Sequence, residues 1–209
     1  ALRMGLAKKL KEENQINYEP DEIVVNCGAK HSCFNAIMAC CDAGDEVIIP
    51  SPYWTSYPEM VNAVGAKPVF ADINLRDANL TRARFDSSDF MNSNMKSSVL
   101  TQTGLYKADL TGVDVSYSTF DRTNIQGADL TEANLTGSIF TDVVGMHIKL
   151  DGADLTGVAL IRSRFDRTTF NNADVTGVDL SESNLSGSKF TGTKHSNWTL
   201  WPSPISPSS

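Results

Sequence analysis

Large apolar residues recur at every fifth position over most of the chain. From Leu75 to Phe190 the pattern runs through 24 consecutive repeats, and Gly145 is the only small residue at a repeat centre. The residue two places before each centre is nearly always Ala, Ser, Thr or Val. Five residues of α-helix rotate a side chain by roughly 140°, and an odd spacing in a flat strand alternates its faces. Neither element buries every centre, so the chain must turn a corner between repeats.

The pattern predicts a coil with four sides. A repeat centre and the residue two places earlier lie on one side of a short extended segment, and we expect both to point inward. The corners contain triplets such as LTG at 110–112, 135–137 and 155–157, in which Gly tolerates positive φ and Thr hydrogen-bonds local backbone. Four corners close a square, so one coil takes about 20 residues and the 24 repeats make about six coils.

A spacing of 20 residues also predicts which side chains stack. The outward positions before six centres form a column of amides and carboxylates: Asn74, Asn94, Asp114, Asn134, Asp154 and Asp174. Inside, Phe120 is expected to stack on Phe140. Gly145 lies one coil before Phe165, so we expect the phenylalanine ring to fill the space that Gly145 leaves.

Residues 1–72 lack the five-residue pattern and instead show the periods of helices and strands. The expected order is α-β-α-β-α-β, with helices over 1–14, 28–41 and 56–64 and strands over 22–27, 46–50 and 67–72.

Composition and charge narrow the possible functions. A chain of 209 residues with 41% hydrophobic and 21% charged residues is globular, and its net charge of −7 disfavours a nucleic-acid binder that neutralises phosphates. No apolar run approaches the roughly 18 residues of a membrane span. Cys40 and Cys41 are expected to be buried free thiols, because no CxxC pair or paired histidine suggests a metal site.

Two sequence motifs, ADL and ANL, recur throughout residues 73–192, together with the longer GADLTG. This region resembles the pentapeptide-repeat, A(D/N)Lxx, family. The resemblance implies a mainly β fold, a right-handed quadrilateral β-helix. Members of the family act mostly as rigid protein-binding rods, many of them in cyanobacteria and chloroplast lumens. The implied function is a non-catalytic scaffold that binds a protein partner, located in the cytoplasm or in the chloroplast or thylakoid lumen.

Some members of that family inhibit DNA gyrase by mimicking duplex DNA, so a DNA-mimic topoisomerase inhibitor is an alternative function. Residues 73–209 contain 15 acidic and 12 basic side chains. This balance does not favour strong mimicry of a polyanion.

The segments NCGAKHS and GDEVIIPSPYWTSYPE give residues 1–72 a different resemblance, to class I pyridoxal-phosphate-dependent aminotransferases of the aspartate or prephenate type. In that family the GAK segment receives the cofactor phosphate at a helix N-terminus, and the tryptophan of PYW stacks on the pyridine ring. The resemblance therefore assigns Gly28, Ala29 and Lys30 to the phosphate corner and Trp54 to the ring platform.

The aminotransferase resemblance ends at Asp72. The family places its Schiff-base lysine, the carboxylate for the pyridinium nitrogen and the substrate-binding arginine further downstream, where this chain has repeats. We therefore interpret residues 1–72 as a partial α/β segment with a relic cofactor site, and we expect no catalytic residues and no bound cofactor. The alternative is an aminotransferase that uses pyridoxal phosphate as one part of a split enzyme. A chimeric gene model would also explain the abrupt change at Asp72 and Ile73.

One outward column departs from the polar norm. Positions 79, 99, 119, 139, 159 and 179 read Asn, Val, Thr, Ile, Ala and Asp, with Ile161 nearby. The apolar residues Val99, Ile139, Ala159 and Ile161 are the candidate face for a protein partner or for a homo-oligomer. Ordinary β-propensity on a solvated sheet explains the column equally well.

The chain end, residues 193–209, no longer follows the repeat. We expect Trp198, Leu200 and Trp201 to cap the last coil, because an open β-helix end exposes unpaired strand edges. The Pro/Ser-rich residues that follow are expected to be disordered.

Overall fold

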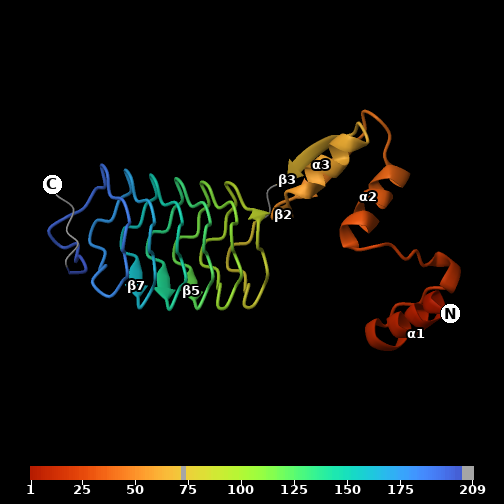
Figure 1. Ribbon diagram of the computed structural model, residues 1–209, viewed down its shortest axis with the longest axis horizontal. Helices are drawn as coiled ribbons and strands as arrows, with labels where there is room; N and C mark the ends of the chain where they lie inside the picture. The colour runs from red at the N-terminus through yellow and green to blue at the C-terminus, as the bar shows by residue number, and fades with distance from the viewer. Residues whose placement is uncertain (72–73, 204–209) are drawn as a thin grey trace. The chain divides into compact units, whose positions relative to one another are not determined.

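The structure is a computed structural model that describes residues 1–71 and 74–203. The chain divides into two compact units (Figure 1). The first comprises Ala1–Val47 and Pro58–Pro68, and the second comprises Ile48–Tyr57 and Val69–Ser209. The expected change of sequence type at Asp72 and Ile73, and the last six residues of the tail, lie outside the described residues.

The amino-terminal elements are short and lie mostly on the surface. They are α1 (Leu2–Asn14), the 3-10 helix η1 (Pro20–Glu22), α2 (Ala29–Cys40), β1 (Glu46–Pro50), β2 (Tyr53–Trp54), α3 (Ser56–Ala63) and β3 (Lys67–Ala71). Gln15 ends α1 in the left-handed conformation, and the Ile16 N–H donates to the Leu10 carbonyl at 3.1 Å. The three expected helices are confirmed, as are the strands expected from residues 46 and 67.

The strand expected over residues 22–27 is wrong. Glu22 ends η1, and the following residues form no strand, which leaves the Val24 side chain 79% exposed. A strand needs a neighbour to bond its backbone, and among the described residues β1 and β3 pair with each other only. The expected burial of Cys40 and Cys41 is also wrong. Cys40 is the last residue of α2, which has no buried residue, and it is exposed, whereas Cys41 follows the helix and is half-buried. Both thiols are free, as expected.

From Asn74 onward the chain winds into stacked coils that form a β-helix (Figure 1). Parallel bridges join residues 20 apart and recur every five residues, for example Asn74 to Asn94 and Asn79 to Val99. On one side the bridges lengthen into a three-stranded parallel sheet of β5 (Thr119–Asp121), β6 (Ile139–Thr141) and β7 (Ala159–Ile161). The predicted stacking interval of 20 residues is therefore confirmed.

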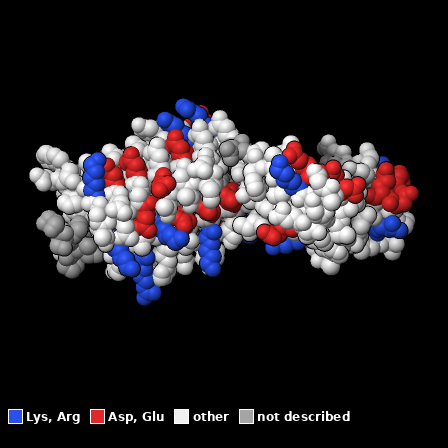
Figure 2. Space-filling view, turned by 90° about the horizontal axis from the view of Figure 1, so that it is seen from above, with Lys and Arg blue, Asp and Glu red and all other residues white. Residues whose placement is uncertain are grey.

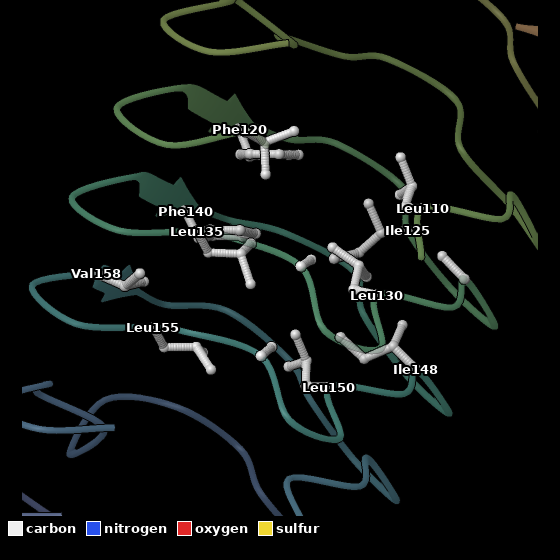
Figure 3. Close-up of a cluster of buried hydrophobic side chains, with 14 of the residues drawn as sticks. Leu110, Phe120, Ile125, Leu130, Leu135, Phe140, Ile148, Leu150, Leu155 and Val158 are labelled. Atoms are coloured by element: carbon white, nitrogen blue, oxygen red, sulfur yellow. The ribbon is translucent and has the colours of Figure 1, made fainter. Parts of the chain in front are cut away.

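Repeat centres fill the interior of the β-helix (Figure 3). Leu130 and Leu135 are buried, which confirms that successive centres all point inward. The Phe120 and Phe140 rings stack with centroids 4.4 Å apart and planes 6° from parallel. A Cβ atom added at Gly145 would lie 3.0 Å from Cε1 of Phe165, so the ring occupies the space that the missing side chain leaves.

The outward amides and carboxylates close the corners of the coils. The Asp109 Oδ1 accepts from the Thr111 N–H at 3.0 Å, and the same bond to the residue two places later recurs along the amide and carboxylate column. Where Gly104 replaces this residue type, Asp86 of the preceding coil accepts instead, from the Tyr106 N–H at 2.9 Å. This explains physically why the motif has Asp or Asn before Leu.

Small inward residues are frequently Ser or Thr because their hydroxyls have buried acceptors. The Ser138 hydroxyl donates to the Val115 carbonyl at 2.7 Å, and the Thr103 hydroxyl donates to the Leu80 carbonyl at 2.8 Å. Each bond reaches the repeat centre 23 residues earlier, one coil away, so these buried hydroxyls also join neighbouring coils.

The first coil is covered incompletely. Leu75, Leu80 and Phe85 are only half-buried, although they pack on the core. Beside this coil, β2 pairs antiparallel with β4 (Ser88–Asp89), and the Tyr53 hydroxyl donates to Asp89 Oδ2 at 2.7 Å. Burial and this hydrogen bond to a carboxylate raise the pKa of Tyr53 to about 12.

At the other end of the β-helix, Trp201 packs edge-on against Phe190 with ring centroids 5.2 Å apart. Leu200 bridges to Asp179 and extends the stacking by one rung, but half of its side chain remains exposed. Trp198 is 82% exposed, so its expected role in the cap is wrong. Only Trp201 of the three expected residues covers the last coil.

An ion pair between neighbouring coils makes the stability of the β-helix depend on pH. Lys149 Nζ lies 2.7 Å from Asp129 Oδ2, one coil away. Burial raises the pKa of the Asp129 carboxyl, but hydrogen bonds from Lys149 and Thr131 outweigh burial, and the pKa lies below its ordinary value of 3.8. This carboxylate therefore stabilises the fold at neutral pH, and that contribution is lost as the pH falls below the ordinary value.

We expect Asp129→Asn to reduce the loss of stability between about pH 7 and about pH 3, because the amide keeps the corner bonds but does not titrate. The free energy of unfolding at each pH, from denaturant titration of both proteins, measures this difference. An unchanged pH dependence in Asp129→Asn would contradict the assignment.

Candidate functional site

The start of α2 carries the first candidate site. Gly28 is the N-cap with φ of 119°, a backbone conformation that favours glycine, and a Cβ atom placed there would meet open space. The Ser32 N–H donates to the Gly28 carbonyl at 3.1 Å as α2 begins. A glycine-opened helix N-terminus of this kind suits an anion such as a phosphate. Ala29 and Lys30 follow in the first turn and are exposed.

Side chains around the α2 N-terminus form a local hydrogen-bond network that the sequence did not predict. The Cys27 thiol and His31 Nδ1 lie 2.9 Å apart, and the Asn26 amide donates to the Ser32 hydroxyl at 3.1 Å. The Asn35 amide in turn donates to Asn26 Oδ1 at 3.1 Å. These bonds fix the turn that leads into the helix.

Trp54, the expected ring platform, lies in β2, and its indole stacks on Tyr57 with ring centroids 6.3 Å apart. It belongs to the second unit, whereas Gly28, Ala29 and Lys30 belong to the first. The local geometry at Gly28 fits a cofactor phosphate. The resemblance assigns Lys30 to the phosphate motif and not to the lysine that bonds the cofactor covalently.

The outward side of the β5–β6–β7 sheet carries the second candidate site. Strand register places Ile139 beside Thr119 on one neighbouring strand and beside Ala159 on the other. Val99 continues the column at the bridge to Thr119. Ile139 is 45% exposed and Val99 38%, whereas Ala159 and Ile161 are half-buried. The four expected residues therefore lie on one side of the β-helix. The two most exposed of these four, Ile139 and Val99, belong to the outward column.

A column of charged residues at the edge of this same side was missed. Arg122, Asp142, Arg162 and Glu182 each stand two places after a repeat centre and 20 residues apart. Arg162 Nε donates to Asp142 Oδ1 at 2.8 Å and Nη2 to Oδ2 at 2.9 Å, a bidentate pair between neighbouring coils. The signal was available, because this position at the same interval of 20 shows alternating charge from Arg122 onward, after Arg82 and Gln102.

Charge is mixed over the β-helix. Figure 2 shows Lys and Arg interspersed with Asp and Glu on the visible side of the repeats, at the left of the view. Within residues 1–71 and 74–203, no group of three or more His, Cys, Asp or Glu side chains is arranged to hold a metal ion. No helix in the described part of the chain has the length and hydropathy needed to cross a membrane.

Family models match both parts of the chain. Residues 105–142 and 148–187 match Pentapeptide repeats, in 8 copies, and residues 1–89 match Aminotransferase class I and II. The chain joins an aminotransferase class I and II segment to pentapeptide repeats. The repeat assignment agrees with the coil interval of 20 residues in the backbone bridges. The aminotransferase match runs past Asp72 and includes the residues of β4.

The aminotransferase segment is similar to several curated enzymes. It is 49% identical over 76 residues to the bifunctional aspartate aminotransferase and glutamate/aspartate-prephenate aminotransferase of Petunia hybrida, covering 36% of this chain and 16% of that protein. It is 46% identical over 77 residues to the aspartate/prephenate aminotransferase of Nitrosomonas europaea, covering 37% of this chain and 19% of that protein. The chain thus spans less than a fifth of the length of either enzyme.

Solved pentapeptide-repeat structures overlap the chain loosely. QnrB1, a plasmid-mediated fluoroquinolone resistance protein, gives a TM-score of 0.40 at 17% identity, covering 75% of this chain and 92% of that chain. A pentapeptide-repeat protein of the Arabidopsis thaliana thylakoid lumen gives a TM-score of 0.26 at 25% identity, covering 53% and 70%. Because these scores are low, the β-helix is assigned from the family model and the backbone geometry.

Proposed function

We propose that the chain is a non-catalytic scaffold that binds protein through the β5–β6–β7 side of its β-helix. The observation that carries this proposal is the apolar face of Val99, Ile139, Ala159 and Ile161, in which Val99 and Ile139 are exposed and the other two are half-buried. The column before the centres of the preceding side consists of amides and carboxylates from Asn74 to Asp174. Burying the apolar column against a partner costs little desolvation of polar groups and removes apolar surface from water.

The finer architecture belongs to the same proposal. We infer about six right-handed, four-sided coils over residues 73–192, preceded by an aminotransferase-like segment at 1–72 and followed by a cap and tail at 193–209. The bridges that recur every five residues support the square cross-section. The family resemblance favours the cytoplasm or a chloroplast or thylakoid lumen as the location.

Residues 1–72 contribute no chemistry in this proposal. Gly28, Ala29, Lys30 and Trp54 retain the form of a phosphate corner and a ring platform, and they act as a relic site. A functional aminotransferase remains the alternative if a second chain supplies the rest of the enzyme. Pyridoxal phosphate would then be the cofactor, and Gly28 and Lys30 would hold its phosphate.

The other alternative is inhibition of a topoisomerase by DNA mimicry. The mixed charge of the repeats does not favour it, since a duplex mimic requires a continuous anionic surface. An assay of DNA supercoiling by gyrase in the presence of the purified chain separates this alternative from a general scaffold.

A photo-crosslinking residue placed at position 139 tests the proposed face, and position 144 provides a matched control. Ile139 and Val144 are both exposed β-branched residues immediately before a repeat centre, on adjacent sides of one coil. We expect crosslinks to protein from position 139 in cells that express the chain, and few from position 144. Equal yields at the two positions would contradict the assignment of the face.

A further inference from the structure

The charged column beside the apolar face is self-complementary when reversed. Its last four members, Arg122, Asp142, Arg162 and Glu182, alternate positive and negative, and Arg82 and Gln102 precede them in the same column. Read from the other end, the order is negative, positive, negative and positive. Two copies of the column aligned in opposite directions therefore place an unlike charge opposite each of these four residues. The side chains of Arg122 and Arg162 are 59% and 61% exposed, although each already pairs within the chain, Arg122 with Asp121 and Arg162 with Asp142, so a second copy adds to existing ion pairs.

We propose that the β5–β6–β7 side binds a second copy of this chain in an antiparallel dimer. The two-fold axis lies in the plane of the interface, along the strands, midway between the coils of Asp142 and Arg162. This axis returns the charged column to the same edge in reverse order. Arg122 then faces Glu182 of the second copy, and Asp142 faces Arg162 of the second copy. The inference rests on the proposed function of this side as a protein-binding face.

The same axis brings the apolar residues together at the centre of the interface. Ile139 falls opposite Ala159 of the second copy, and Thr141 falls opposite Ile161. An apolar centre with a charged edge is the usual anatomy of a protein interface. The exposed Ile139 side chain therefore loses its contact with water on both copies.

No like charges meet elsewhere on this side. Asp121 falls opposite Ser181 of the second copy, and Asp179 falls opposite Thr119. A parallel dimer lacks this fit, because its axis runs along the β-helix and turns the charged column toward the other edge. That edge carries Tyr117, Gly137, Gly157 and Gly177, which offer no charge. Charge complementarity thus selects the antiparallel arrangement.

The size of the face predicts a reversible dimer. Four of the six stacked levels face each other about this axis, those from Thr119 to Asp179. At ~4.8 Å per level and about five extended residues of width, two such faces together bury on the order of 600 Å². This area is below that of a stable interface, so the dimer forms weakly and at high protein concentration. Exposed charges at its edge also make the association sensitive to salt.

A double-mutant cycle between Arg122 and Glu182 tests the arrangement. The two residues are three coils apart in one chain, roughly 14 Å, which exceeds the Debye length of about 8 Å at physiological salt. Coupling between them in the association constant therefore arises through the second copy. Sedimentation equilibrium of the full chain over a range of concentrations measures that constant, and thermal unfolding confirms that each variant is folded.

We expect Arg122→Glu and Glu182→Arg each to weaken dimerisation by roughly 3- to 10-fold, since each change affects two symmetry-related pairs. The double variant should return to within about twofold of the wild type, because the exchanged charges pair again. Arg167→Glu is the matched control. It reverses an exposed charge at the same repeat position on the next side, and dimerisation should not change.

A chain that stays monomeric at every concentration, or single variants whose effects simply add, would overturn the dimer. Photo-crosslinks from position 139 distinguish the proposed protein-binding face from the proposed dimer. Crosslinks to a different protein from a monomeric chain would retain the binding face and reject self-association. Equal crosslinking from positions 139 and 144 would reject both.

Discussion

Phe165→Ala is expected to lower the free energy of unfolding of the β-helix by about 3–5 kcal/mol. The ring is buried and lies one coil above Gly145, which has no side chain to occupy the space below it. It also packs edge-on to Phe140 with ring centroids 6.2 Å apart. The bridges between coils hold the backbone on both sides, so the walls of the new cavity have little room to collapse. Denaturant unfolding followed by circular dichroism measures the loss.

Phe165 and Gly145 share one space inside the β-helix, so substitutions at the two positions should affect each other. Gly145→Leu alone should destabilise the wild type by about 1–3 kcal/mol, because its Cβ would lie 3.0 Å from the ring. In the Phe165→Ala background the same leucine fills the cavity, so the double variant should be more stable than the sum of the single effects. Additive effects would show that the two positions do not share this space. Val144→Ala, at an exposed neighbour, should change stability by no more than about 0.5 kcal/mol.

Amino-group transfer from aspartate or glutamate by this chain is expected to be undetectable. Transamination needs a lysine that bonds the cofactor and moves the substrate proton, and a carboxylate that keeps the pyridine nitrogen protonated. Loss of one general acid or base lowers a rate by about 10²- to 10⁴-fold, and several groups of the family pattern lack counterparts here. A coupled assay for oxaloacetate, with added pyridoxal phosphate, measures the activity.

Lys30→Ala is the diagnostic variant for this prediction. The resemblance places Lys30 at the cofactor phosphate, so the variant should reduce only weak, non-covalent binding of pyridoxal phosphate. Measurable transamination by the wild type, together with a stable absorbance band of bound cofactor that disappears in Lys30→Ala, would show that the site is functional. A Trp54→Ala variant then reports whether the ring platform takes part.

The sequence predicted the β-helix because its repeat is strict. Each centre must be apolar, and each outward Asp or Asn bonds the backbone two residues later, as Asp109 does with Thr111. These requirements are local and recur in every coil, so residues such as Phe120 and Phe140 could be placed in contact from their spacing alone. The candidate residues of the phosphate corner and the partner face could likewise be named from motifs and columns.

Only the tertiary structure decided what the non-repeating residues do. The Val24 region has the composition of a strand but no neighbour to pair with, and Trp198 has the size of a cap but stays exposed. Two interactions depend on contacts between coils. Asp86 accepts the hydrogen bond that a side chain at Gly104 would otherwise accept, and Arg162 pairs with Asp142. The sequence by itself determined the period, the core and the coil interval, because short-range backbone geometry fixes these. Burial, edge pairing and charge registry were decided by the tertiary structure, because they depend on which segments lie next to one another in space.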